Sequence, residues 1–431
     1  MVQTDCGDVP VVHEADVVIV GGGPAGVCAA VAAAEEGAET LLVERYGFLG
    51  GMATAGLVNP FMPYRAGSEQ VNAGAFQRMI DWFEELGGWS HRPNAPTAFD
   101  PEVAKLALDL MVQQAGVRLL LHSYLVGAES AGGRVQKVVT AGKSGLQGIA
   151  ARVFIDASGD ADLAALAGAR YELGRPEDGF CQPMTMNFRM AGVDEDRLPS
   201  RETITELFLA AKARGEIDNP RENCLWFFTT RPGEIHFNTT RVVKLDATRT
   251  EDMTAAELEG RKQVREMVRF LTTRVAGFEH AHLSALPTQI GIRESRRVVG
   301  DYVLTTEDVL SARKFPDGIA RGAYPVDIHN PAGTGTVIQH LPAGEAYDIP
   351  YRCLCPVGFD NLLVAGRPIS SDHGAHSSHR VMPIAACNGE AAGVAAALCV
   401  AGQHDIRGIA VSELRARLKA RGASIYEPPV T

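Results

Sequence analysis

The feature that most constrains the fold is a glycine-rich turn between an apolar strand and a helix near the N-terminus. Residues 16–20, Asp-Val-Val-Ile-Val, form a β-branched run without polar alternation, which is typical of a parallel strand covered on both faces. The spacing Gly21-x-Gly23-x-x-Gly26 follows at once, and Pro24 suits the first position of a helix. Glycines in this pattern let backbone N–H groups and a helix N-terminus approach a pyrophosphate. The pattern predicts a dinucleotide-binding turn.

A second apolar run completes a βαβ unit of the Rossmann type. Residues 39–44, Glu-Thr-Leu-Leu-Val-Glu, are expected to form a strand that ends in Glu44. A carboxylate at this position can accept hydrogen bonds from a ribose diol, and it repels a 2′-phosphate. The alternative is a tight glycine turn beside a solvated glutamate. The flanking strand and helix favour a dinucleotide-binding turn over this alternative.

The rest of the chain alternates between two patterns. Short strand candidates between 117 and 155 predict a β-meander attached to a parallel sheet. Mixed strands and helices follow, including a helix expected after the capping-box spacing at 254–257. A buried strand and an alanine-rich helix, 381–401, then return to the first pattern. We therefore expect an α/β protein in which a discontinuous dinucleotide-binding domain (1–185 and 346–431) carries an inserted α+β substrate or cap domain (186–345).

Charge and composition exclude several classes of function. The 431 residues include 41 Lys and Arg against 52 Asp and Glu, so the formal charge is −11, which disfavours nucleic acid and anionic lipid as partners. Residues 1–15 lack the basic start and apolar run of a secretory signal, and the Gly-Pro turn interrupts the apolar stretch 17–34. The eight cysteines contain no CxxC pair, which favours reduced thiols in a cytoplasmic protein.

Four blocks of sequence form a more specific pattern than the glycine turn alone. They read VERYGFLGGMAT at 43–54, FIDASGD at 154–160 and GIRESRRVVGDY at 291–302, and the fourth covers 361–397. In this order, and over about residues 16–400, the chain resembles the FAD-dependent oxidoreductase family that is distantly similar to the fumarate reductase and succinate dehydrogenase flavoproteins. The resemblance implies FAD as the cofactor and a Rossmann-like FAD-binding domain.

The resemblance also implies which residues contact FAD. The glycine turn would hold the diphosphate, Glu44 the ribose, and the N-terminus of helix 381–401 would stabilise negative charge on the reduced ring. The residues implied are Gly21, Gly23, Pro24, Ala25, Gly26, Glu44, Arg45, Gly50, Gly51, Met52, Leu125, Ser158, Gly159, Asp160, Gly366, Arg367, Met382 and Pro383.

A histidine-rich loop, 370–380, is the first candidate for proton chemistry. Its three imidazoles and one guanidinium can exchange protons and bind carboxylates near neutral pH. The His-x2-His-x2-His spacing does not match the usual zinc motifs, so no metal is expected. We predict that His376 and Arg380 are catalytic, with His373 as a further candidate.

A charged cluster at 293–297 is the second candidate. It lies on an expected strand, so that alternate members face opposite sides, and Arg296 is predicted to take part in catalysis. Internal Arg–Glu pairing is the alternative role for this cluster. Cys181, Cys353 and Cys355 are candidates for redox activity or flavin attachment, although inert packing is favoured for them.

These features predict an FAD-dependent dehydrogenase or reductase that transfers hydride between a small organic substrate and N5 of the flavin. A second glycine fingerprint is lacking, so electrons come from the substrate or from an external donor or acceptor. One alternative is an NAD-dependent dehydrogenase, and another is a non-catalytic flavin or electron-relay subunit, in which iron–sulfur cysteine spacing is expected. Sugars, hydroxy acids, amines and unsaturated acids are all compatible substrates, and a homo-oligomer is compatible as well.

Overall fold

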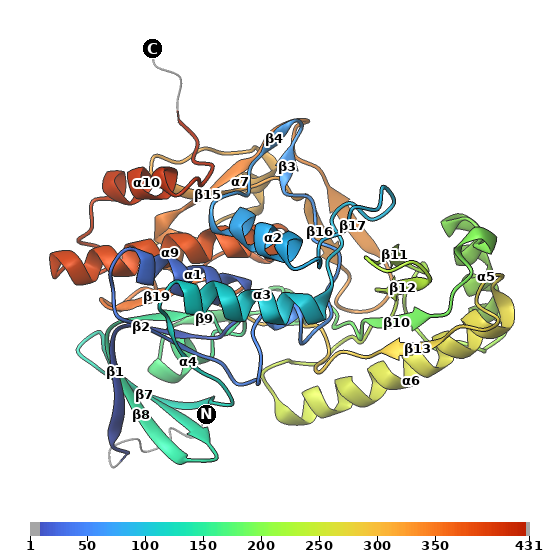
Figure 1. Cartoon of the computed structure of the whole chain (residues 1–431), viewed down its shortest axis with the longest axis horizontal. Helices are drawn as coiled ribbons and strands as arrows, with labels where there is room; N and C mark the ends of the chain where they lie inside the picture. Colours follow the sequence, from blue (N-terminus) through green and yellow to red (C-terminus); the bar gives the residue numbers. More distant parts are fainter. Residues whose placement is uncertain (1–8, 428–431) are drawn as a thin grey trace.

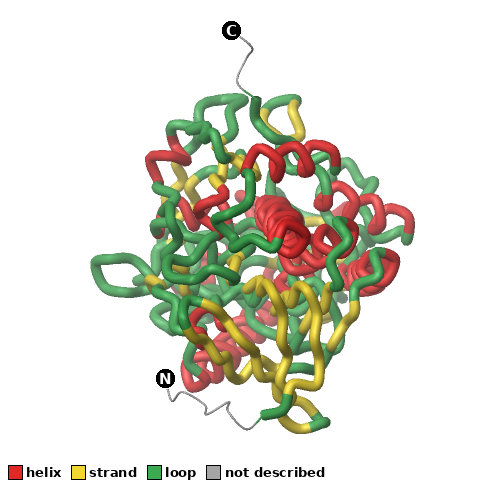
Figure 2. Tube along the Cα trace, turned by 90° about the vertical axis from the view of Figure 1, so that its left-hand side faces the viewer, coloured by secondary structure: helices red, strands yellow, loops and turns green. Residues whose placement is uncertain are grey.

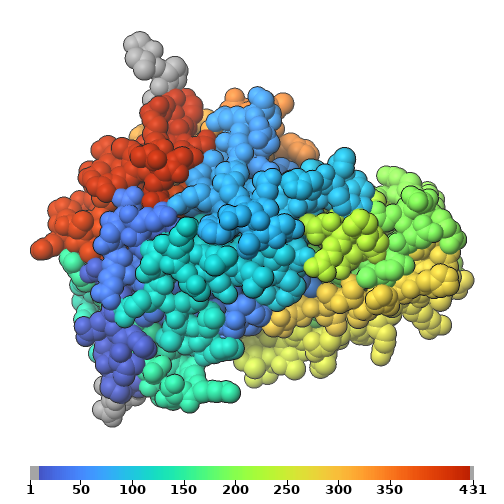
Figure 3. Space-filling view, in the orientation of Figure 1, coloured from blue at the N-terminus to red at the C-terminus, as the bar shows by residue number. Residues whose placement is uncertain are grey.

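A computed structural model describes residues 9–427 of the chain, so the N-terminal part of the segment 1–15, discussed above as a candidate signal, lies outside the described residues. Figure 1 shows a large body of sheet and helices that contains both ends of the described chain, and a smaller lobe of residues from about 190 to 285. The two pack directly against each other in the space-filling view (Figure 3).

A seven-stranded sheet forms the centre of the large body. Its order is β5-β2-β1-β8-β7-β6, and β19 also pairs with β8. The pairs among β5, β2, β1, β8 and β19 are parallel, whereas β8, β7 and β6 form an antiparallel meander. The strands are β1 (Val11–Val20), β2 (Thr40–Val43), β5 (Arg118–Leu120), β6 (Tyr124–Ala131), β7 (Arg134–Gly142), β8 (Gly145–Asp156) and β19 (Leu362–Val364). The predicted α/β fold, with a parallel sheet and a meander, is confirmed, and Figure 2 shows these strands below the helices.

Two helices pack closely together against this sheet. Helix α1 (Pro24–Glu35) begins with proline after Gly23, and α9 (Met382–Gly402) crosses it through small residues. A Cβ atom on Gly389 would lie 2.2 Å from the carbonyl oxygen of Ala25, so this approach requires glycine. Among the described residues, α9 is the one helix long and apolar enough to cross a membrane, and most of its apolar stretch is buried inside the protein, as in a core helix.

The remaining elements of the large body surround this sheet and helix pair. The helices are α2 (Ala75–Glu85), α3 (Pro101–Gln114), α4 (Asp162–Ala167), α7 (Thr306–Leu310), α8 (His373–His379) and α10 (Val411–Ala420), with 3-10 turns η1 (Gly51–Ala53) and η3 (Tyr351–Leu354). The short strands are β3 (Arg65–Ala66), β4 (Glu69–Gln70), β9 (Tyr171–Leu173), β14 (Arg296–Val298), β15 (Gly318–Gly322), β16 (Val326–His329), β17 (Thr336–Gln339) and β18 (Tyr347–Pro350).

The smaller lobe has its own sheet and its own hydrophobic core. The antiparallel order is β11-β12-β10-β13, and two helices flank it. The elements are β10 (Phe188–Ala191), η2 (Glu195–Arg197), α5 (Arg201–Ala213), β11 (Trp226–Phe228), β12 (Glu234–Phe237), α6 (Thr250–Arg274) and β13 (His282–Ala285). Aromatic side chains such as Phe188, Phe237 and Phe270 fill the core between them. Helix α6 begins at Thr250, one turn before the capping-box spacing at 254–257 that was expected to start it.

The hydrophobic cores divide the chain differently from the predicted domains. The core of the smaller lobe is built from residues between Met184 and Ile290. Leu304, Phe315 and Ile319 fall inside the predicted cap domain, yet they pack into the core of the large body. The domain boundaries at 186 and 345 stay a prediction. The second boundary separates Leu304, Phe315 and Ile319 from the core into which they pack.

Candidate functional site

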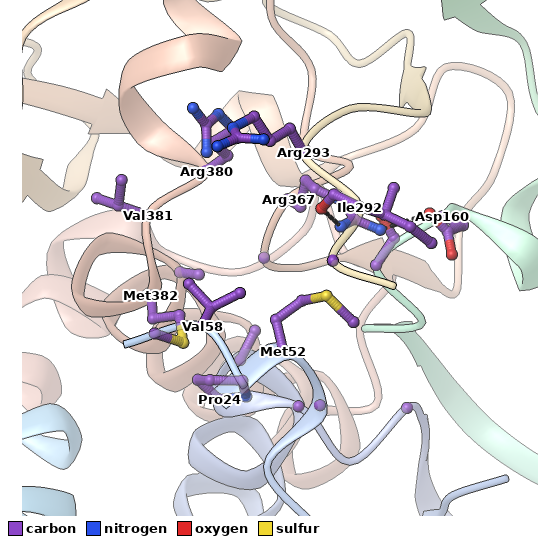
Figure 4. Close-up of a pocket in the computed structure, with 18 of the residues that line it drawn as sticks. Pro24, Met52, Val58, Asp160, Ile292, Arg293, Arg367, Arg380, Val381 and Met382 are labelled. Carbon is purple, nitrogen blue, oxygen red and sulfur yellow. Dashed lines mark hydrogen bonds and ion pairs between the residues drawn. The ribbon is translucent and has the colours of Figure 1, made fainter. Parts of the chain in front are cut away.

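A large cavity lies where the parallel strands end. Its lining includes residues just after β1, β2, β8 and β19, which is the edge of an open α/β sheet where ligands bind. The space not filled by protein atoms, open solvent included, is about 1370 Å³. Figure 4 shows Pro24 and Met52 on one side of this cavity and Arg293 and Arg380 on the opposite side.

The glycine turn has the geometry that a diphosphate requires. Gly21 has a φ of +104°, and a Cβ on Gly26 would lie only 1.7 Å from the carbonyl oxygen of Gly21, so neither position accepts a side chain. Gly23 is different, because a Cβ there would meet nothing nearer than the Cα of Gly51, 3.8 Å away. No side chain caps α1, whose first N–H groups have no partner within the helix. The turn therefore offers free backbone donors to an anion in the cavity.

Glu44 lies at the end of β2 as predicted and is held by backbone donors. Its Oε2 accepts a hydrogen bond of 2.6 Å from the N–H of Gly22, and its Oε1 accepts one of 2.8 Å from the N–H of Tyr46. Burial raises the pKa of this carboxyl, and the two backbone hydrogen bonds oppose that rise. Beside it a second hollow, which includes Leu125, shares Gly21 and Glu44 with the first. This hollow is where the predicted adenosine end of the cofactor would lie.

The structure brings together most of the residues predicted to bind the cofactor. Leu125 lines the second hollow, while Gly26, Gly50 and Pro383 line neither cavity. Gly26 packs against the turn itself, and Gly50 has a φ of +108°, so both shape the backbone around the site. The large cavity is lined by Gly21, Gly23, Pro24, Ala25, Glu44, Arg45, Gly51, Met52, Ser158, Gly159, Asp160, Gly366, Arg367 and Met382. The backbone cradle, the buried carboxylate and the small residues fit FAD.

Three of the four residues predicted to be catalytic do not line the cavity. His376 is fully buried in α8, its ring nitrogens have no hydrogen-bond partner among the described residues, and burial lowers its pKa well below the ordinary value. Nδ1 of His373 lies 2.9 Å from Oε1 of Glu294. Arg296, on β14, donates to Asp162 at 2.8 Å. Of the four, only Arg380 lines the cavity.

The charged cluster at 293–297 is divided between two roles. Arg297 pairs with Glu294 inside the protein, which is the internal pairing considered as the alternative for this cluster. Only 296–298 form a strand, and Arg293, just before it, lines the cavity. Cys181, Cys353 and Cys355 are buried and line neither cavity, and burial raises their pKa values, which favours packing over redox chemistry. Among residues 9–427, no three His, Cys, Asp or Glu side chains are grouped so that they could hold a metal ion.

The far side of the cavity contains polar residues that sequence reasoning missed. Tyr324, Asp327 and His329 line it from β16 and the segment before it. The Tyr324 hydroxyl donates to Oδ2 of Asp327 at 2.8 Å, and Nε2 of His329 lies 3.4 Å from the same oxygen. Burial and the nearby charge of Arg293 lower the pKa of His329 to about 3, so its imidazole is neutral. The one sequence signal was the Asp-x-His spacing, which places both side chains on one face of a strand.

The chain matches a protein-family model over most of its length. The family described as FAD dependent oxidoreductase matches residues 16–418. Similar solved structures include a geranylgeranyl bacteriochlorophyll reductase-like protein from Thermoplasma acidophilum (13% identity, TM-score 0.47, covering 95% of this chain and 84% of that one) and the L-proline dehydrogenase from P. horikoshii (12% identity, TM-score 0.45, covering 95% and 99%). No curated protein matches the chain. Because the family match extends over nearly the whole sequence, the protein belongs to the FAD dependent oxidoreductase family and its cofactor is FAD.

Proposed function

We propose that this flavoprotein is a dehydrogenase or reductase that acts on a small organic acid, held by two arginines on the far side of the cavity from the glycine turn. The observation that carries the proposal is that Arg293 and Arg380 line the cavity without forming an ion pair with any described residue. When bound, FAD supplies a ring whose N5 exchanges hydride with a substrate carbon.

The two guanidinium groups leave donors for a ligand. Arg293 is oriented by Pro183, whose carbonyl oxygen accepts at 2.9 Å, and by Asn238, whose side-chain oxygen accepts at 3.1 Å. The side chain of Arg380 has no hydrogen bond to the described residues, and its Nε is buried. Figure 4 shows the two guanidinium groups next to each other. Burial and the charge of Arg380 lower the pKa of Arg293, so a bound anion would relieve an unfavourable pair of like charges.

A carboxylate suits this pair better than a neutral group does. Guanidinium presents parallel N–H donors that match the two oxygens of a carboxylate. The cavity around the pair also contains the side chains of Asn187 and Asn238, which can hydrogen-bond other polar groups of the same molecule. The arrangement favours acids over sugars and simple amines among the substrate classes that the sequence left open.

Asp327 is placed to handle the proton of the reaction. Its Oδ2 accepts the hydrogen bond from Tyr324, while Oδ1 has no hydrogen bond to the described residues. Oxidation of a carbon that bears a hydroxyl or amino group breaks one C–H bond and one O–H or N–H bond. Bound FAD would supply the acceptor for the C–H electron pair, as hydride, and Asp327 would take the proton, so the step balances. In reduction the same carboxyl group returns the proton.

The other parts of the proposal concern the setting of the enzyme. An external electron acceptor or donor would complete each cycle, because the second glycine fingerprint of a nicotinamide domain is lacking in the sequence. All seven cysteines within the described residues are free and buried, which supports the cytoplasmic location expected from the sequence.

The experiment is anaerobic titration of the purified yellow protein with matched pairs of compounds. Each pair consists of a hydroxy, amino or unsaturated acid and its neutral amide or ester, and bleaching of the flavin bands is measured. Acids are expected to bleach the flavin and their neutral partners are not. Arg293→Met should raise the KM for the acid by about 30- to 5,000-fold, the loss expected when one partner of a buried charge pair is removed. Arg214→Gln, at an exposed surface pair with Glu216, is the control. Equal bleaching by acids and by their neutral partners would refute the proposal.

A further inference from the structure

Behind the cavity lining, a buried arginine contacts the residues that handle the proton. We propose that Arg241 is a positioning residue: through Nδ1 of His329 it directs the Nε2 proton of that imidazole onto Asp327, and so fixes the carboxylate that receives the substrate's proton. The inference rests on the proposed function, in which Asp327 accepts that proton. Arg241 itself does not line the cavity.

Arg241 connects the smaller lobe to the strand that carries Asp327 and His329. Its backbone exchanges two hydrogen bonds with the side chain of Gln263 on α6, of 2.8 and 3.0 Å. Its Nη1 donates to the carbonyl oxygens of Gly333 and Gly335 at 3.1 and 3.0 Å, in the loop between β16 and β17. The side chain is only 1% exposed. Glu222 also pairs with the guanidinium, its Oε2 lying 3.0 Å from Nη1, so the group is held in place where Nη2 meets His329.

The contacts at the two ends of the His329 ring select one neutral tautomer. Nη2 of Arg241 lies 3.1 Å from Nδ1, and an arginine can only donate, so Nδ1 must accept. At the other end Nε2 faces a carboxylate oxygen of Asp327 at 3.4 Å, which favours a proton on Nε2. A proton on Nδ1 would face the guanidinium and would leave the lone pair of Nε2 against the carboxylate. Both contacts therefore favour the same form.

Thr336 strengthens this selection. Its hydroxyl lies 3.2 Å from Nδ1 of His329, and it also lies 2.7 Å from Oε1 of Glu222. Because the hydroxyl has one proton and the glutamate can only accept, that proton is directed to Glu222. The threonine oxygen in turn accepts from Nη2 of Arg241 at 3.1 Å. The arginine is left as the donor that satisfies Nδ1.

The result is a carboxylate with two donors on one oxygen, on a backbone that is anchored to α8. Tyr324 and His329 both face Oδ2 of Asp327, and the backbone N–H of Asp327 donates to Oγ of Ser377 on α8 at 2.9 Å. The side chain of Asp327 is only 10% exposed. With Oδ2 occupied, Oδ1 is the oxygen available to a substrate. If His329 turned or changed tautomer, Oδ2 would lose a donor and the carboxylate could rotate.

The first test reads the tautomer directly by NMR of the holoenzyme labelled with 15N in its histidines. The His329 signals are assigned as those absent from His329→Gln, and the protonated nitrogen is identified from the 15N shifts. We expect Nε2–H in the wild type and in Arg241→Lys, whose ammonium group can only donate to Nδ1. We expect its loss in Arg241→Leu. Wild-type His329 protonated on Nδ1, or an unchanged Nε2–H form in Arg241→Leu, would overturn the proposal.

The second test measures flavin bleaching with the acid that reduces the wild type fastest. Arg241→Leu should lower kcat by roughly 10²- to 10⁴-fold with KM nearly unchanged, the range for loss of an effective proton acceptor, whereas Arg241→Lys should keep most of the activity. Asn330→Ala is the control, because it removes two hydrogen bonds within the same loop and touches neither Arg241 nor the His329 ring. An equal loss of kcat in Asn330→Ala would show that the loop, and not the tautomer, is responsible. If no acid bleaches the flavin, the proposed function fails, while the NMR experiment still decides whether Arg241 sets the tautomer.

Discussion

Replacing Gly23 with valine should remove the cofactor and leave the fold intact. Gly23 has a φ of −72° and a ψ of −178°, which any residue adopts, and the nearest atom to an added Cβ is 3.8 Å away. The valine methyl groups would instead occupy the side of the cavity where the diphosphate is expected. The substitution therefore separates cofactor binding from folding.

The size of the effect follows from the donors that the diphosphate would lose. The N–H groups of Ala25 and Gly26, in the first turn of α1, have no partner within the helix. A hydrogen bond to a charged group contributes about 1.5–3 kcal/mol, so the loss of two weakens binding by about 3–6 kcal/mol. At 1.4 kcal/mol per tenfold, the Kd for FAD should rise by roughly 10²- to 10⁴-fold.

The assay is the flavin content of purified protein together with FAD titration of the stripped apoprotein. Far-UV circular dichroism and urea unfolding of the valine variant should match those of stripped wild-type protein, because bound FAD stabilises only the holoenzyme. Gly26→Ala is the contrasting variant: its Cβ would lie 1.7 Å from a backbone oxygen, so it should damage the fold itself. A valine variant that keeps a full complement of FAD at wild-type Kd would show that the diphosphate does not rest on this turn.

Three further predictions concern stability. Gly389→Ala must widen its contact with a carbonyl oxygen of α1 from 2.2 Å to at least 3.0 Å, so the free energy of unfolding should fall by about 1–3 kcal/mol in urea, whereas Gly333→Ala, with nothing within 4 Å, should be neutral. Burial lowers the pKa of His379 to about 3, so below about pH 6.5 the unfolded chain binds more protons than the native one. The free energy of unfolding should therefore fall by up to about 1.4 kcal/mol per pH unit between pH 6.5 and 3. An unchanged slope in His379→Gln would contradict this prediction. Arg367→Met leaves the buried carboxylate of Asp160 without its ion-pair partner, so the free energy of unfolding, measured thermally, should fall by about 3–5 kcal/mol. Adding Asp160→Asn in a double variant should restore most of that loss.

Local sequence could predict the elements whose residue pattern lies within a few consecutive positions. The runs 17–20 and 362–365 are β-branched or apolar throughout, and both belong to parallel strands of the main sheet. The start of α6 could not be predicted from its capping-box spacing, because the hydroxyl of Thr254 bonds back to the carbonyl oxygen of Thr250 inside the helix, at 2.9 Å. Packing decides which core a residue joins, so Leu304 and Phe315 could not be assigned to the large body from sequence.

The same distinction separates the two halves of the candidate site. Predicted cofactor residues such as Glu44 and Asp160 lie within four residues of a strand end, and strand ends converge at one edge of a parallel sheet. The histidines of α8 attracted attention by their number, but the helix is packed inside the protein, and His376 has no access to the cavity. Asp327 and His329 come from a short strand with no motif, and the tertiary contacts of β16 with α8 and the smaller lobe bring them opposite Arg293.

The charges around Asp327 couple acid binding to proton transfer in the proposed reaction. Burial alone would raise the pKa of this carboxyl, but the hydrogen bond from His329, the charge of Arg380 and the hydrogen bond from Tyr324 hold it well below its usual range. A carboxylate that acidic is a poor proton acceptor. An acid bound between Arg293 and Arg380 brings a negative charge that offsets theirs, so the pKa of Asp327 must rise as the substrate arrives. A neutral analogue would leave the cations uncompensated and Asp327 unable to take the proton. A neutral substrate should therefore show a lower kcat as well as a higher KM. A site that used the arginines for binding alone would change KM only.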